Sequence, residues 1–248
     1  MTFHDHFSAV AAEYAASRPR YPKALFDFLA RATTGHQLVW EAGCGSGQAS
    51  AGLAADFELV IATDASAEQI ANAERVSNVQ YSVAAERNPA LRDASVDLVA
   101  VAQAVHWFDR TVFYNEVERV LRPGGLLAAW TYGLTTITPD VDAIVYPWYR
   151  DVLGAYWPPE RQLVEDHYRD IRFPYTPLSV PALTMREAWT REQLIAYCAT
   201  WSAVKEYRLR TGGDALAALI PQLEAVWPDA APREVRWPLT VLVGGPRR

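Results

Sequence analysis

The feature that most constrains the fold is an apolar run that ends in a glycine-rich turn. Residues 38–42 read LVWEA, and the turn that follows reads GCGSG, with glycine at positions 43, 45 and 47. Glycine allows tight turns and lets a ligand come close to the backbone. The pattern therefore predicts a buried strand whose carboxyl end opens into a ligand-binding turn.

The same order of strand and helix signals repeats along the first half of the chain. Short β-rich runs alternate with stretches that can each hold a helix, which is typical of parallel β/α units. Ser66 and Gln69 have capping-box spacing, so a helix is expected near Ser66, and an earlier one near Gln48. The expected strands are Leu38–Ala42, Leu59–Thr63, Val79–Val83, Asp97–Ala102 and Leu126–Trp130. The chain is therefore predicted to be an α/β protein.

The alternation stops after Trp130. Residues 139–170 carry several aromatic residues among prolines and are expected to form an irregular or helical insertion. Two interpretations stay open: the aromatic side chains pack the insertion onto the sheet, or some of them line an apolar substrate pocket. Trp148 is the candidate substrate contact in this segment.

The C-terminal part, residues 171–248, is expected to complete the sheet with further helices and strands. One helix is expected from Arg186 to about Tyr207, with Thr190 and Gln193 at capping-box spacing, and another over Asp214–Val226.

The C-terminal end of the chain is predicted to add a strand, and the N-terminal end a cover over the ligand-binding edge. Val235–Val243 looks like a strand, in which Pro238 should lie at the start, at an edge or at a bulge because it cannot donate a backbone hydrogen bond. Residues 5–31 form an interrupted amphipathic stretch, so residues 1–34 are expected to act as an N-terminal helical cap or lid over the ligand edge.

Composition narrows the class of partner. The 248 residues are 50% hydrophobic with a formal net charge of -6, and no run of Lys or Arg is longer than Arg247 and Arg248. These values argue against nucleic acid and favour a small-molecule partner. Cys44 and Cys198 are the two cysteines, which gives neither a disulfide framework nor metal-ligand spacing. With no signal-peptide pattern and no long apolar run, a cytoplasmic protein that does not span a membrane is expected. The oligomeric state is not indicated.

The glycine turn does not match the motifs that bind phosphate. A dinucleotide fingerprint needs a third glycine at position 48 or 50, where Gln48 and Ser50 stand, and no Gly-Lys-Ser/Thr follows for a Walker A loop. Glu41, two residues before the first glycine, would repel a pyrophosphate and attract a cationic ligand. S-adenosylmethionine has an ammonium, a sulfonium and no phosphate, so it fits this turn.

Acids after the next two strands supply further contacts for such a ligand. Asp64 follows the second expected strand, where a carboxylate can accept hydrogen bonds from both ribose hydroxyls. Asp64 has the alternative of a helix cap. Ala85 and Glu86 follow the third strand and can meet an adenine ring, although Glu86 has the alternative of a solvated loop acid.

These residues resemble the class I S-adenosylmethionine-dependent methyltransferases. The resemblance rests on E-x-G-x-G-x-G at the exit of the first strand, Asp64 after the second, and RVLRPGGLLAAW at 119–130, and it covers roughly residues 35–132. The segments FSAVAAEYAASRPRYP, AVHWFD and ATWSAVKEYR are more narrowly similar to the small-molecule branch that includes trans-aconitate methyltransferase. The resemblance implies a Rossmann-like, seven-stranded, mostly parallel sheet with helices on both faces and an antiparallel last strand.

The resemblance also implies which positions contact the cofactor. Within the core the expected cofactor contacts are Glu41, Gly43, Cys44, Gly45, Gly47, Asp64, Ala65, Ala85, Glu86, Gln103 and Ala104. Tyr14 and Arg18 of the N-terminal cap are expected to join them, with Arg18 placed to bind a carboxylate. Arg20, Tyr21 and Trp107 are candidate substrate contacts, with a solvated surface position as the alternative for Arg20. No metal is expected.

His106, after the fourth expected strand, is the candidate catalytic residue. An imidazole with an unperturbed pKa of about 6.5 can take a proton from a hydroxyl or an activated carbon. The alternative is that His106 hydrogen-bonds the backbone or positions the substrate without taking a proton. The Asp/Asn-Pro-Pro-aromatic stretch common in nucleobase amine methyltransferases is absent at this place in the sequence.

The sequence thus predicts a single domain that transfers a methyl group from S-adenosylmethionine to a small organic molecule, with O-methylation of a carboxylate or hydroxyl favoured. The alternatives are C- or N-methylation, an NAD(P)-dependent oxidoreductase, and a cofactor-binding protein without turnover.

Overall fold

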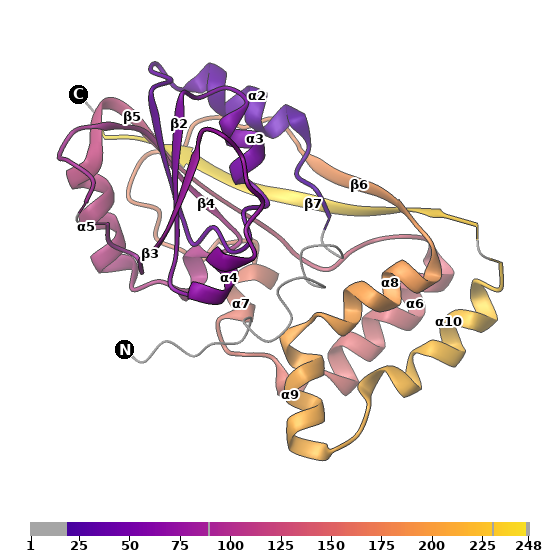
Figure 1. Cartoon of the computed structure of the whole chain (residues 1–248). Helices are drawn as coiled ribbons and strands as arrows, with labels where there is room; N and C mark the ends of the chain where they lie inside the picture. Colours follow the sequence, from indigo (N-terminus) through magenta and orange to yellow (C-terminus); the bar gives the residue numbers. More distant parts are fainter. Residues whose placement is uncertain (1–18, 89, 230, 247–248) are drawn as a thin grey trace.

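The computed structural model describes residues 19–88, 90–229 and 231–246, which form a seven-stranded sheet flanked by helices (Figure 1). The strands are β1 (Leu38–Ala42), β2 (Leu59–Asp64), β3 (Val79–Val83), β4 (Val96–Ala102), β5 (Leu121–Tyr132), β6 (Thr184–Trp189) and β7 (Arg233–Gly244). Their order is β3-β2-β1-β4-β5-β7-β6. Strands β1 to β5 pair in parallel, and β7 is antiparallel to both of its neighbours. The predicted α/β class, the seven strands and the antiparallel last strand are confirmed.

Helices cover both faces of the sheet, as predicted. Successive side chains of a strand point to opposite faces. In β1, Val39 therefore packs with helices α2 (Lys23–Ala32) and α3 (Ser50–Ala54), whereas the neighbouring Trp40 packs with α5 (Arg110–Val120). Both side chains are fully buried. Figure 1 shows α2 and α3 on one side of the strands and α5 on the other.

Two short helices follow strands at the carboxyl edge. They are α4 (Ala67–Ala71) after β2 and the 3-10 helix η2 (Val105–Trp107) after β4. The Ser66 side chain accepts a hydrogen bond from the backbone of Gln69 and caps α4, as the spacing of these residues predicts.

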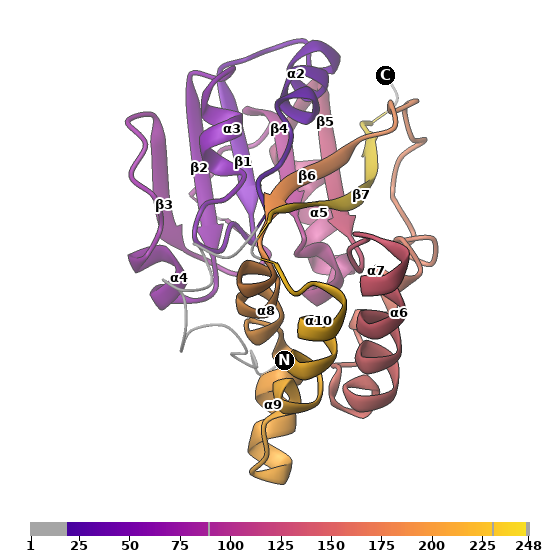
Figure 2. The same cartoon turned by 90° about the vertical axis from the view of Figure 1, so that its right-hand side faces the viewer.

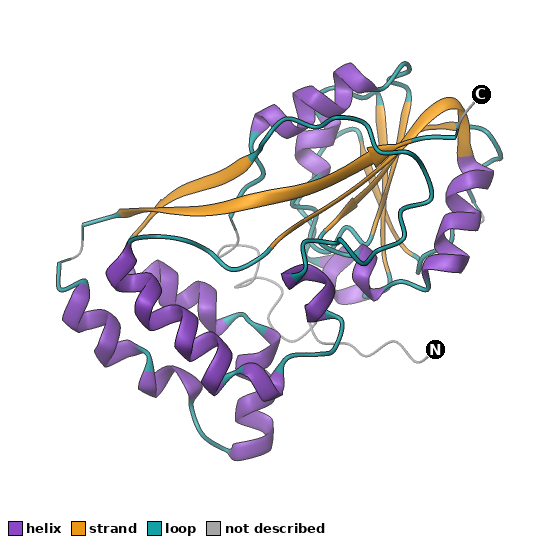
Figure 3. Ribbon diagram, turned by 180° about the vertical axis from the view of Figure 1, so that it is seen from behind, coloured by secondary structure: helices purple, strands orange, loops and turns teal. Residues whose placement is uncertain are grey.

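The remaining helices form a second body beside the sheet, which we call the helical lobe. It comprises α6 (Pro139–Pro147), the π-helix η3 (Trp148–Val152), η4 (Gly154–Tyr156), α8 (Arg191–Ala199), α9 (Ser202–Thr211), η5 (Ala215–Ala218) and α10 (Ile220–Val226). Helix α7 (Arg161–Glu165) lies apart, with Val164 in the core of the sheet face that α5 covers. Strands β6 and β7 reach from the sheet to the lobe (Figures 2 and 3). None of the described helices is both long enough and apolar enough to cross a membrane.

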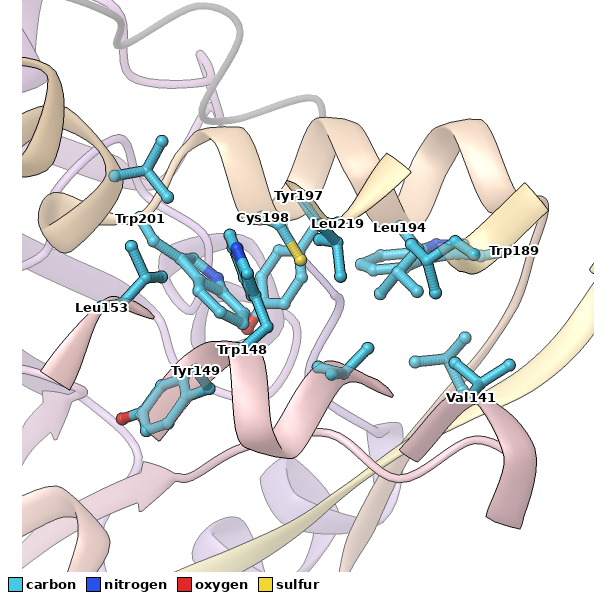
Figure 4. Packing of buried hydrophobic residues seen from close by; sticks show 14 of the residues in the cluster. Val141, Trp148, Tyr149, Leu153, Trp189, Leu194, Tyr197, Cys198, Trp201 and Leu219 are labelled. Carbon is cyan, nitrogen blue, oxygen red and sulfur yellow. The ribbon is translucent and has the colours of Figure 1, made fainter. Parts of the chain in front are cut away.

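The lobe has its own aromatic core (Figure 4). Trp148 donates its indole N–H to the carbonyl of Ala215 at 2.9 Å, and its ring lies 5.8 Å from that of Trp201. Met185 and Trp237 bring the β6–β7 ribbon into the same core. The aromatic residues of the insertion therefore bury mainly against α8 to α10 and this ribbon.

The single helix expected from Arg186 to about Tyr207 is wrong. Residues up to Trp189 form strand β6, in which Met185 and Trp189 are buried on one face. Thr190 then forms a full capping box with Gln193 and starts α8, and buried Trp201 separates α8 from α9. The capping signal was correctly located, but the alternation that marks the strand was missed.

Pro238 occupies a special position inside β7. Residues 233–238 pair with β6, and residues 239–244 pair with β5. Pro238 thus lies at the point where one ladder ends and the other begins, opposite Thr184. Proline has no backbone N–H to donate, and the junction between the two ladders is a place where β7 can accommodate it.

Candidate active site

A cavity of about 1180 Å³ opens at the carboxyl ends of the parallel strands and extends to the helical lobe. One end, which we call the sheet end, is formed by the segments that follow β1, β2, β3 and β4. The other end, the lobe end, is formed by residues 156–160 and helix α9. Ligands of open parallel sheets bind at this edge.

The glycine turn after β1 forms part of the sheet end. Gly43, Gly45 and Gly47 have φ values of +68°, +55° and +85°, which side chains rarely allow. A Cβ on Gly43 would lie 2.6 Å from the Cβ of Ala104, whereas a Cβ on Gly45 would meet no protein atom closer than 3.9 Å. Gly43 therefore serves packing, and Gly45 leaves room for a ligand against the backbone.

Asp64 connects this turn to the start of α4. Its carboxylate accepts hydrogen bonds from the backbone N–H of Gly45 at 2.9 Å and of Ser66 at 2.8 Å, and it lines the cavity. Asp64 therefore acts in part as the helix cap given as its alternative role, because the Ser66 N–H lies at the start of α4. The same carboxylate also fixes the glycine turn, so Asp64 has a structural role beside its expected contact with a ribose.

Glu41 does not face the cavity, which corrects the expectation that its charge draws in a cationic ligand. Its side chain is completely buried, and the Ser50 hydroxyl donates a hydrogen bond to Oε2. Burial raises the pKa of Glu41 to about 8, so at neutral pH the carboxyl group is mostly uncharged. Oε1 has no hydrogen-bond partner among the described residues. Glu41 therefore has a structural role, because it binds Ser50 at the start of α3, shortly after the glycine turn.

The cavity is nonetheless acidic, because of other residues. Among the described lining residues Arg210 is the one cation, and its guanidinium pairs with Glu206. The acids that line the cavity are Asp64, Glu86, Asp109, Glu160 and Glu206. An anionic pyrophosphate fits this lining poorly, and a cationic adenosyl ligand fits it well. The acidic lining, the space beside Gly45 and the size of the cavity all suit S-adenosylmethionine.

A smaller cavity of about 70 Å³ adjoins the lobe end, and the residues that line both cavities are Gln103, Trp107, Tyr132, Trp157, Pro158 and Ser202. The walls that it adds are His106, Gly133, Leu134, Arg161, Tyr197 and Trp201. The small cavity therefore combines several aromatic walls with one imidazole and one guanidinium.

His106 is fixed in this small cavity in its neutral form. Its ring is buried, and Nδ1 lies 2.9 Å from the hydroxyl of Tyr168. Burial, with further contributions from Arg161 and Arg110, lowers the pKa of His106 to about 3. The expectation of a base with a pKa near 6.5 is therefore wrong for this environment. Tyr168 itself has a φ of +56° next to His167 at +53°, so a tight turn presents its hydroxyl to His106.

Arg161 is held by a chain of hydrogen bonds. Its Nε donates to the hydroxyl of Tyr149 at 2.7 Å, and that hydroxyl donates to Glu165. The guanidinium lies 4.9 Å from the centre of the Trp157 ring, in cation–π contact. The side chain is 18% exposed. The guanidinium is therefore oriented on an aromatic surface at the wall of the small cavity.

Most of the predicted site residues meet at the cavity. Tyr21 and Trp107 line it, and Tyr21 packs edge-on against Trp130 at 5.7 Å. Gly47, at the end of the turn, does not line the cavity, and a Cβ on it would lie 2.4 Å from the Tyr81 hydroxyl. The predicted cofactor contacts that line the cavity are Gly43, Cys44, Gly45, Asp64, Ala65, Ala85, Glu86, Gln103 and Ala104.

Four other predictions have different outcomes. Trp148 as a substrate contact is wrong, because its ring is buried in the lobe core and its N–H is used by Ala215. Arg20 is exposed, does not line either cavity and donates its backbone N–H to Glu187. Tyr14 and Arg18 lie outside the described residues, as does most of the predicted N-terminal lid.

Sequence reasoning missed most of the lobe end. The missed lining residues include Tyr132, Tyr156, Trp157, Arg161, Ser202 and Glu206. The many aromatic residues of 139–170 suggested that some of them line a pocket. That interpretation selected Trp148, whereas Tyr156 and Trp157 line the cavity. Arg161 and Ser202 carry no local motif.

Gln103, directly after β4, lines both cavities and has a strained backbone conformation. Its φ is +55°, and its side-chain amide exchanges hydrogen bonds with the backbone of Tyr132, at 3.0 Å from N and 3.1 Å from O. This exchange fixes the segment that begins at Gln103 against β5. No group of three or more His, Cys, Asp or Glu within the described ranges could hold a metal ion.

The comparisons with known proteins agree on one family. A family profile described as "Methyltransferase domain" matches residues 40–129. A Dictyostelium discoideum protein described as a methyltransferase is 36% identical over 204 residues, which cover 81% of this chain and 78% of that protein. A solved structure from Anaeromyxobacter dehalogenans, described as a type II methyltransferase, is 46% identical with a TM-score of 0.86 and covers 92% of this chain and 97% of its own.

A more distant relative names the methyl donor. A Saccharomyces cerevisiae protein described as an S-adenosylmethionine-dependent methyltransferase is 27% identical, over 66% of this chain and 59% of its own length. The chain thus spans less than two thirds of this relative. None of the three proteins is described by its methyl acceptor.

Proposed function

The chain belongs to the class I S-adenosylmethionine-dependent methyltransferases, and from this premise we propose that it methylates a small organic molecule on an oxygen atom, most favourably a carboxylate. The cofactor occupies the sheet end of the large cavity, and the acceptor occupies the lobe end with the adjoining small cavity. The observation that carries this proposal is the neutral, buried His106 among aromatic walls.

The sheet end supplies the cofactor contacts. The open space above Gly45 accepts the part of the cofactor that lies against the turn, and Asp64 accepts hydrogen bonds from the ribose hydroxyls. Ala85 and Glu86, after β3, meet the adenine. The acidic lining favours the positive centres of the cofactor over a phosphate ligand.

The lobe end decides which acceptor can react. When bound, S-adenosylmethionine supplies a methyl group that is already activated by its sulfonium. The protein has to align the acceptor and exclude water, which can account for about 7 to 11 kcal/mol of a barrier. Trp107, Tyr132 and Trp157 line this region with aromatic rings that can align the acceptor and exclude water.

The environment of His106 favours an acceptor that arrives without a proton. A base with a pKa of about 3 takes few protons at neutral pH. A carboxylate needs no base: its oxygen forms the new bond to the methyl carbon, the carbon–sulfur bond breaks, and sulfur keeps the electron pair. His106 then positions the acceptor through the ring nitrogen that Tyr168 does not use.

The test is methyl transfer from isotope-labelled S-adenosylmethionine to a panel of small carboxylic acids, phenols, amines and activated carbon acids. We expect labelled products from the carboxylic acids, and we expect alkali to release the label as methanol, because methyl esters hydrolyse in base. Label that resists alkali would contradict carboxylate methylation: on a phenol it would indicate O-methylation of a hydroxyl, and on an amine or a carbon acid it would favour the N- or C-methylation alternatives. Absence of saturable S-adenosylhomocysteine binding would contradict the whole proposal.

A further inference from the structure

We propose that Arg161 is the residue that binds the acceptor, and that it does so through a carboxylate attached to a planar, unsaturated body. This inference rests on the proposed function and specifies the acceptor end of the same cavity. Its starting point is the arrangement of Arg161 between the aromatic walls of the small cavity.

The hydrogen bonds of Arg161 leave one side of its guanidinium available. Nε is used by Tyr149, and Glu165 lies 3.8 Å from the same nitrogen. Neither Nη1 nor Nη2 donates a hydrogen bond to any residue that the structure describes. An arginine presents five N–H donors in a planar fork, and the fork matches both oxygens of a carboxylate.

The surroundings of Arg161 increase the need for an anion. The side chain is largely shielded from water, and five of the residues that line the small cavity with it are tryptophan or tyrosine. A cation in such a place attracts an opposite charge more strongly than a surface arginine does. Arg210, the cation of the large cavity, differs because its Nε donates to Glu206 on the exposed face of α9.

The shape of the walls specifies the body of the acceptor. Trp107, Trp157 and Trp201 line the small cavity with Tyr132 and Tyr197. Flat aromatic walls pack best against a flat ligand, because offset and edge contacts between rings add to the burial of apolar area. The guanidinium is itself stacked near Trp157, so a planar carboxylate can extend along the same surface.

The experiment compares trans-cinnamate with the uncharged trans-cinnamamide as calorimetric probes. Binding is measured on the full-length protein with and without saturating S-adenosylhomocysteine. We expect the wild type to bind cinnamate at least tenfold more tightly than cinnamamide, and Arg161→Gln to bind both within about twofold. Arg161→Lys, which keeps the charge but loses the fork, should retain part of the preference and guards against a folding defect of the glutamine variant.

The matched control is Arg169→Gln, since Arg169 is an exposed arginine that lines neither cavity. This variant should keep the wild-type preference. The inference is overturned if the wild type shows no preference for cinnamate, or if Arg161→Gln retains it. Loss of S-adenosylhomocysteine binding by the wild type would instead contradict the proposed function, and the cinnamate comparison without that ligand would still decide the role of Arg161.

Discussion

The two ends of the cavity are built in different ways. The sheet end comes from segments that directly follow successive strands, so its residues lie at fixed places in a regular sheet. The lobe end is assembled from residues far apart in the chain, such as His106, Trp157 and Trp201, and it depends on an aromatic core of its own. The difference indicates that the fold itself specifies the sheet end, whereas the packing of the lobe specifies the lobe end.

Two tryptophans of the lobe provide the largest test of this comparison. Trp148→Ala removes a buried ring and should lower the free energy of unfolding by about 3 to 5 kcal/mol, because Trp148 fills the lobe core. Trp157→Ala, at the cavity wall, should cost less stability and mainly raise KM for the acceptor. Denaturant unfolding and steady-state kinetics check both variants. Equal stability losses with equal kinetic effects would contradict the separation of core from wall.

Two glycines with positive φ separate backbone strain from ligand contact. Gly45 and Gly212 have φ values of +55° and +70°, and a Cβ on either would meet no close protein atom. Alanine at each should cost about 1 to 2 kcal/mol of stability. Gly45→Ala alone should weaken S-adenosylhomocysteine binding, by roughly a hundredfold or about 2.8 kcal/mol. Similar binding by the two variants would mean that the turn does not contact the cofactor.

Asp64→Asn tests the acid that joins the turn to α4. The amide keeps one acceptor oxygen but places N–H groups opposite a backbone donor, either at Gly45 or at Ser66. We expect S-adenosylhomocysteine to bind about tenfold more weakly, or about 1.4 kcal/mol, as measured by calorimetry. Glu86→Gln is the comparison variant and should have a smaller effect. Wild-type affinity in Asp64→Asn would remove Asp64 from the cofactor site.

Glu41→Gln tests the buried carboxyl group beneath the comparison of the two ends, and its effect on stability should depend on pH. Because the folded pKa of Glu41 is raised from 4.5 to about 8, its contribution to stability is complete below pH 4.5 and is lost as the pH rises through 8. The glutamine variant lacks this loss. Its melting temperature relative to wild type should therefore increase between pH 5 and about pH 8. A constant difference across this range would contradict the buried, neutral carboxyl group.

The sequence predicted the sheet end better than the lobe end for a physical reason. Strand ends and glycine turns are local patterns, so Gly45, Asp64 and Glu86 could be placed along one edge before their distances were known. Local pattern does not report burial of a single side chain, which is why the charge of Glu41 and the pKa of His106 were misjudged. It reports still less about Arg161, whose orientation depends on partners contributed by the insertion.

Calorimetric titration of S-adenosylhomocysteine into the wild type, Gly45→Ala and Arg161→Gln tests the division of the cavity most directly. We predict saturable binding of equal strength to the wild type and to Arg161→Gln, because Arg161 belongs to the acceptor end, and binding that is roughly a hundredfold weaker to Gly45→Ala. Unchanged binding by Gly45→Ala, together with a loss in Arg161→Gln, would contradict the assignment of the two ends.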